Sequence, residues 1–71
     1  MDKDTLKILE DAERMIKSIE SRLSEMNDMD KIEAGLAIIK TMKSINDNIE
    51  PSRRLLKILW SFDDLIAKLE A

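Results

Sequence analysis

Ten of fifteen residues are apolar in the stretch LLKILWSFDDLIAKL, which runs from Leu55 to Leu69 and contains both aromatic residues of the chain. Its apolar residues recur at alternating spacings of four and three, which places one set on a single stripe of an α-helix: Leu55, Leu59, Phe62, Ile66 and Leu69. Four more widen that stripe beyond a narrow seam: Leu56, Ile58, Trp60 and Leu65. A helix this apolar must be covered on more than one side, so we expect the rest of the chain to pack around it.

Composition limits the chain to a small soluble domain. Its 71 residues allow one domain, 1–71, with a small core. The chain has no cysteine and no histidine, which excludes disulfides and argues against a zinc site. Its net charge is −3, with acids and bases interspersed, which argues against a general nucleic-acid or anionic-membrane binder. There is no long apolar run and no signal-peptide core at the N-terminus, so we expect a cytoplasmic protein without a membrane partner.

The first helix is expected over residues 4–26. Asp4 or Thr5 can cap its start, since either side chain can accept from free backbone N–H groups. Apolar residues then alternate by three and four without a break and form a seam toward the core: Leu9, Ala12, Ile16, Ile19, Leu23 and Met26.

A second helix is expected over residues 31–47. Asp30 and Glu33 have the spacing of a capping box, which predicts a start near Lys31. We expect one apolar face to point into the core: Ile32, Leu36, Ile39, Met42, Ile45 and Ile49, flanked by Ala37 and Ile38. Gly35 lies at the edge of this face, where a glycine destabilises a helix by roughly 0.5–1 kcal/mol relative to alanine. We therefore expect another helix to approach closely there.

The third helix is expected over residues 51–70, with Pro51 in its first turn, where its missing N–H has no cost. Short turns between helices of similar length predict an all-α, antiparallel up-down-up three-helix bundle, which could associate into a larger helical bundle. That arrangement would place Arg53, Arg54 and Lys57 near Asp2 and Asp4. The structural alternative is a long helical hairpin that is continuous through Pro51, with the third segment exchanged between two copies.

The residues that usually carry catalysis are scarce. Without His, Cys or Tyr, only carboxylates, lysines and hydroxyls remain as acids, bases or nucleophiles. The paired acids along the chain are better explained as caps, turns or solvated faces. We therefore expect no enzyme, no cofactor, no metal site and no small-molecule substrate.

The strongest functional signal is a second apolar line on the third helix, formed by Leu56, Trp60 and Ala67. A three-helix monomer would leave at least part of this line exposed, and an exposed tryptophan is typical of an interface hot spot. Alternatively, a wide stripe faces two neighbouring helices and Trp60 lies over the edge of the core. On the first interpretation the anchors are Leu56 and Trp60, with a polar rim of three cations: Arg53, Arg54 and Lys57.

The sequence therefore predicts a protein-protein interaction or self-association module that uses the outer face of the third helix. Its partner would be another protein or a second copy of the chain. Two alternatives remain open. One is a designed or engineered bundle, with no natural activity or with a transplanted binding surface, which the narrow helix-forming alphabet allows. The other is a small nucleic-acid-binding regulator, in which the basic cluster grips phosphate and Trp60 stacks on a base.

Overall fold

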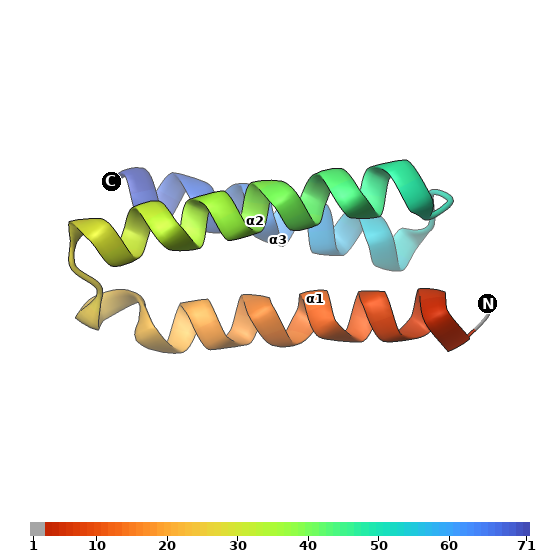
Figure 1. Cartoon of the computed structure of the whole chain (residues 1–71), viewed down its shortest axis with the longest axis horizontal. Coiled ribbons are helices and arrows are strands. Elements are labelled where there is room, and N and C mark those ends of the chain that lie inside the picture. Colours follow the sequence, from red (N-terminus) through yellow and green to blue (C-terminus); the bar gives the residue numbers. More distant parts are fainter. Residues whose placement is uncertain (1–2) are drawn as a thin grey trace.

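The computed structural model describes residues 3–71, which form three helices and one short 3₁₀ turn. In chain order they are α1 (Lys3–Arg22), η1 (Leu23–Glu25), α2 (Asp28–Asn48) and α3 (Arg53–Glu70). Figure 1 shows α2 antiparallel to α1, and α3 antiparallel to α2, in a rod of 37 × 17 × 16 Å. The predicted three-helix bundle is confirmed. The hairpin continuous through Pro51 is wrong, because α2 ends before that residue and α3 begins after it.

The inward face of α1 is the predicted one. Leu9, Ala12, Ile16 and Ile19 are buried, and Leu23 and Met26 are partly buried against them. The α-helix itself ends at Arg22, and the last predicted turn is the tighter 3₁₀ helix. Such a turn is common at the end of an α-helix, because it satisfies carbonyls that have no partner further along.

Helix α2 begins three residues earlier than predicted, at Asp28. The capping box is real, but its members are Asn27 and Asp30: the Asn27 side chain accepts from the Asp30 N–H at 2.8 Å, and the Asp30 carboxylate accepts from the Asn27 N–H at 3.5 Å. Asp30 therefore lies in the first turn and does not cap the helix. Asparagine is as good an N-cap as aspartate, so the sequence offered two equivalent starting points.

The predicted inward face of α2 is wrong in its first half. Ile45 and Ile49 are buried as expected and Met42 is partly buried, but Ile38, which was expected only at the flank, is as fully buried as Ile45. Ile32, Leu36 and Ile39 are 60, 57 and 55 % exposed. The line facing the core also carries residues less apolar than leucine, among them Ala34 and Thr41. The Thr41 hydroxyl donates to the Ala37 carbonyl at 2.9 Å and lies 3.7 Å from the Met15 sulfur of α1.

The close approach expected at Gly35 is also absent. Within residues 3–71, no heavy atom outside its own helix backbone and chain neighbours lies within 4 Å of the place where a Cβ would sit. Gly35 lines an open groove instead. The space that the missing side chain leaves is therefore not used by the bundle.

Helix α3 is the centre of the core, as its sequence predicts. Five of its residues are buried: Leu55, Ile58, Phe62, Leu65 and Leu69. Leu59 and Ile66 pack against them at the edges. The predicted start at Pro51 is wrong, because Ser52 caps the helix by accepting from the Leu55 N–H at 3.1 Å. No helix in the described part of the chain is both long and apolar enough to cross a membrane.

Candidate protein-binding surface

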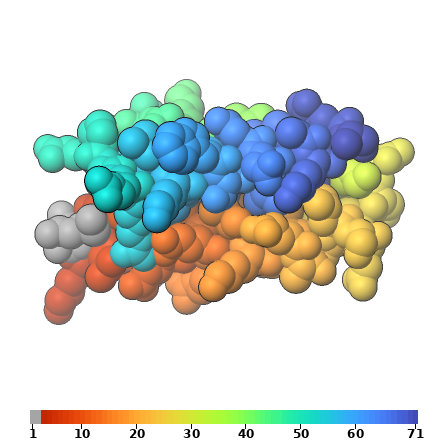
Figure 2. Space-filling view, turned by 180° about the vertical axis from the view of Figure 1, so that it is seen from behind, coloured from red at the N-terminus to blue at the C-terminus, as the bar shows by residue number. Residues whose placement is uncertain are grey.

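The structure places Leu56 and Trp60 outside the core, on the face of α3 that points away from the other two helices. Trp60 is 66 % exposed and Leu56 is 44 % exposed, which decides against a tryptophan lying over the core. Figure 2 views the molecule from the side on which α3 lies along α1. We call Leu56 and Trp60, together with the cations beside them, the α3 patch.

Two of the three predicted cations belong to the α3 patch. Arg53 and Lys57 line a shallow depression together with Leu56 and Trp60, and Pro51 and Ser52 complete its rim. The turn before α3 therefore forms one end of the patch. Cationic heads beside an exposed tryptophan combine an apolar surface with charge, the usual make-up of an interface anchor and its rim.

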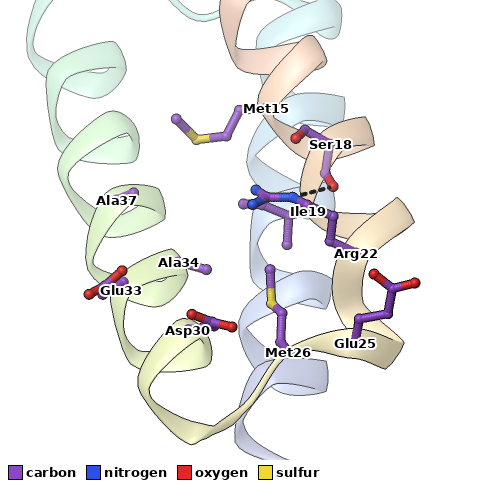
Figure 3. Close-up of a pocket in the computed structure, with 10 residues that line it drawn as sticks. All are labelled: Met15, Ser18, Ile19, Arg22, Glu25, Met26, Asp30, Glu33, Ala34 and Ala37. Carbon is purple, nitrogen blue, oxygen red and sulfur yellow. Dashed lines mark hydrogen bonds between the residues drawn. The ribbon is translucent and has the colours of Figure 1, made fainter.

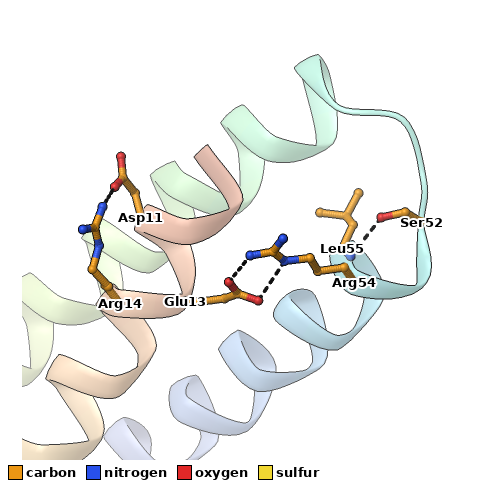
Figure 4. A network of polar contacts seen from close by, with 6 residues as sticks. All are labelled: Asp11, Glu13, Arg14, Ser52, Arg54 and Leu55. Carbon is orange, nitrogen blue, oxygen red and sulfur yellow. Dashed lines mark hydrogen bonds and ion pairs between the residues drawn. The ribbon is translucent and has the colours of Figure 1, made fainter. Parts of the chain in front are cut away.

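Arg54 lies on another side of α3 and points toward α1. Its Nε donates to Glu13 Oε2 at 3.1 Å and its Nη2 donates to Glu13 Oε1 at 2.5 Å, as Figure 4 shows. These hydrogen bonds lower the pKa of Glu13 and raise that of Arg54 from their ordinary values. The sequence prediction named Asp2 and Asp4 as the acids beside this basic segment, whereas the partner of Arg54 is Glu13, and Asp2 lies outside the described residues.

The Glu13–Arg54 pair gives a pH-dependent contribution to stability. A carboxyl whose pKa is lowered in the folded state stabilises the protein above its unfolded pKa, about 4.3 for glutamate. The contribution is lost as the pH falls through the lower, folded value. Both side chains are more than a third exposed, at 37 and 39 %, so solvent screens the pair and its effect is small.

We expect Glu13→Gln to lower the urea midpoint of unfolding slightly at pH 7, and we expect this difference to shrink as the pH falls below about 4.3 and the wild-type carboxylate takes up a proton. The measurement is urea unfolding of both proteins between pH 3 and pH 7. Glu10→Gln is the matched control, since it removes a charge one turn away without breaking the ion pair. A loss that is equal at both ends of the pH range would contradict the assignment.

A second exposed apolar surface lies on α2, and sequence reasoning assigned its residues to the core. Ile32, Leu36 and Ile39 border a groove that continues onto Ile66 and Leu69 of α3. We call these five residues and Gly35 the α2 groove. The signal that could have revealed it is present in the sequence: α2 carries isoleucines on opposite sides, which one inward face cannot all use.

The opening between α1 and α2 is of a different kind. Figure 3 shows Met15 and Met26 projecting into it, with Arg22 at its border. Arg22 donates to the carbonyl of Ser18 in its own helix at 3.2 Å. Flexible methionines fill irregular gaps, so this opening is explained by loose packing at the α1–α2 edge. Within residues 3–71 no group of three or more His, Cys, Asp or Glu is placed to hold a metal ion.

Comparisons with protein-family models, with curated proteins and with solved structures find no match to this chain.

Proposed function

We propose that this chain is a non-catalytic protein-interaction module and that the α3 patch binds another protein. The observation that carries the proposal is the exposure of Trp60, at 66 %, on a helix whose opposite face is the centre of the core. The anchors are Leu56 and Trp60, and the polar rim is formed by Arg53 and Lys57.

The energetic reason is that a largely exposed tryptophan leaves much apolar area in water. An aromatic side chain buries about 150–250 Å² when it is covered, so covering the exposed two-thirds of Trp60 is worth roughly 3 kcal/mol at 25 cal/mol per Å². Folding does not gain this free energy. A partner that covers Trp60 does, which is why tryptophan is enriched among hot-spot residues.

The nucleic-acid alternative is less well supported by the same geometry. It rests on three cations around Trp60, but Arg54 is held by Glu13 on another side of α3. On the other flank of Trp60 the surface includes Asp64, which is paired with Lys68 at 3.0 Å, and Glu20, which repels phosphate. Two cations beside these acids favour a protein partner over a polyanion.

The alternative of a designed or engineered bundle concerns the origin of the chain more than the chemistry of its surface. A bundle built to carry a transplanted binding surface would bind through the same exposed residues, so the binding experiment applies to both. Thermal unfolding addresses the origin, since idealised designs often remain folded above about 90 °C and natural domains of this length usually do not.

The test is the effect of Trp60→Ala on binding. Proteins retained from a cell extract by the immobilised wild-type chain, but not by the variant, are purified and their affinities measured. For a partner on the α3 patch we expect Trp60→Ala to weaken binding about 30-fold or more, which corresponds to the 2 kcal/mol of a hot spot. We also expect Trp60 fluorescence to shift to the blue in the wild-type complex.

The matched control is Ile8→Ala, which truncates an apolar side chain exposed on α1 and should leave the affinity unchanged. Melting temperatures of both variants exclude unfolding as the cause. The proposal fails if wild type and Trp60→Ala retain the same proteins with the same affinities.

A further inference from the structure

The α2 side of the α2 groove is an apolar surface that neither the core nor the α3 patch uses, and Ile66 and Leu69 at the edge of the core form its other side. Ile32, Leu36 and Ile39 are each more than half exposed, and the groove passes from them over Gly35 to Ile66. Three large aliphatic side chains in a row on one helix face are costly to leave in water. Covering this face with another apolar surface would be favourable, and the sequence of α2 indicates which surface fits it.

We propose that the α2 groove binds a second copy of this chain, with the two α2 helices antiparallel about a two-fold axis that passes between Gly35 and Leu36. The inference goes beyond the proposed function, since it concerns another surface and another partner. Seen along α3, Trp60 lies about 120° around the helix from Ile66, so the α3 patch stays free in such a dimer.

The exposed face of α2 is symmetric about this point. Ile32 lies three residues before Gly35, and Ile39 lies three residues after Leu36. In a two-fold antiparallel pair, residues equally far from the axis on its two sides meet across the interface. Each copy therefore packs its Ile32 against Ile39 of the second copy, and the same contact occurs twice.

Charge follows the same symmetry. Asp28 lies seven residues before Gly35, on the rim of the groove, and Lys43 lies seven residues after Leu36, two turns from it on the same helix face. The two-fold pairing brings Asp28 of each copy near Lys43 of the other. A parallel pair would instead place like charges opposite each other. The two Asp28–Lys43 contacts therefore favour the antiparallel pair over the parallel one.

Gly35 gains a role in this arrangement. Among the residues that the structure describes, no heavy atom outside its own helix backbone and chain neighbours lies within 4 Å of the place of its missing Cβ, so intramolecular packing gives no reason for a glycine that weakens the helix. At the two-fold axis the Gly35 residues of the two copies face each other. Because glycine has no side chain, the two helix axes can approach to about 8 Å, the short end of the usual 8–10 Å range. On the other side of the axis the two Leu36 side chains meet.

Disulfide cross-linking tests the register directly, because the chain has no cysteine and each variant carries a single thiol. We expect Leu36→Cys to form a covalent dimer with a mild thiol oxidant, since the two residues lie together at the axis. Ile39→Cys alone should not, because its two copies are roughly 10 Å apart along the helix. A mixture of Ile32→Cys and Ile39→Cys should cross-link. Efficient cross-linking of Ile39→Cys alone, or none at Leu36→Cys, would overturn the proposal.

The mass in solution is the independent measurement. The mass of the wild type, measured by light scattering, should rise with protein concentration toward twice 8.2 kDa. Leu36→Glu should stay near the monomer mass with its helical circular dichroism intact. Ala37→Glu is the matched control, since it adds the same charge to the neighbouring exposed residue on another side of α2, and it should dimerise like the wild type.

Reversing the charges of Asp28 and Lys43 is a third test of the dimer. Lys43→Asp alone should weaken the dimer, and adding Asp28→Lys should restore it. A wild type that is monomeric at every concentration refutes the dimer. A dimer that persists in Leu36→Glu but is lost in Trp60→Glu would mean that the chain self-associates through the α3 patch and not through the α2 groove. Neither result decides whether the α3 patch binds another protein, so the two proposals can fail separately.

Discussion

Phe62→Ala should strongly destabilise the protein, whereas Trp60→Ala should stay nearly as stable as the wild type. The chain has only these two aromatic residues, two positions apart on α3, and the structure gives them opposite environments. Phe62 is fully buried at 0 % exposure and Trp60 is 66 % exposed. Truncating a buried phenylalanine to alanine costs about 3–5 kcal/mol, from lost transfer free energy and the cavity left behind. A domain of this size has roughly 4–10 kcal/mol of stability, so the loss is a large part of the total.

The measurement is thermal and urea unfolding followed by circular dichroism. For a domain of 60–100 residues each kcal/mol lowers the melting temperature by about 4–8 °C, so we expect Phe62→Ala to lower it by about 15 °C or more. Trp60→Ala should lower it by a few degrees at most, although it removes the larger side chain. Similar losses in the two variants would mean that Trp60 belongs to the core and that the α3 patch is not a free surface.

The inward faces of α1 and α3 could be predicted from sequence because their apolar residues leave a polar face opposite. In α1 the seam from Leu9 to Ile19 lies opposite a face of charged and polar residues, and the sequence alternation of three and four singles out one phase of the helix for burial. In α3 the stripe is wider, and the pattern predicted that Leu56 and Trp60 lie at its limit without deciding whether they are covered. Whether these two side chains are covered depends on where α1 and α2 lie, and a local sequence pattern carries no information about that.

Helix α2 could not be predicted in the same way because apolar residues lie on two of its sides. Choosing the face with the most large aliphatic residues put Ile32, Leu36 and Ile39 inside, whereas packing selects Ile38 and smaller residues such as Ala34 in the first half of the helix. Binary patterning assumes that apolar residues point inward, and it fails where a surface is apolar for another reason. The place where the sequence reasoning failed is therefore the place where a second binding surface is proposed.

Local hydrogen bonds explain the remaining differences. Asn27 and Asp30 both have the chemistry of a cap, and only the backbone path decides that Asn27 takes this position. Arg54 was grouped with Arg53 and Lys57 because the three are close in sequence. Residues one apart on a helix point about 100° away from each other, and this rotation turns Arg54 toward Glu13 of α1.

The corrected face of α2 leads to a prediction on two adjacent isoleucines. Ile38→Asp should unfold the protein, and Ile39→Asp should leave it folded. Both changes replace isoleucine with aspartate in the same helix, so the change in helix propensity is about the same, and it is small because the two residues rank close together. Ile38 is 0 % exposed and Ile39 is 55 % exposed. Only Ile38→Asp loses a buried aliphatic side chain, worth about 2–5 kcal/mol, and also places an unpaired carboxylate in the core.

Helical circular dichroism at low protein concentration separates the two variants. We expect Ile38→Asp to lose most of its helical signal at 25 °C, because the combined cost approaches the whole stability of the domain. Ile39→Asp should keep that signal while light scattering shows it as a monomer, since its carboxylate would lie in the proposed contact with Ile32 of a second copy. The reverse result, with Ile39→Asp unfolded and Ile38→Asp folded, would restore the face expected from sequence and remove the α2 groove. A helix with two apolar sides has to use one for the core, and this pair of variants identifies which side remains for a partner.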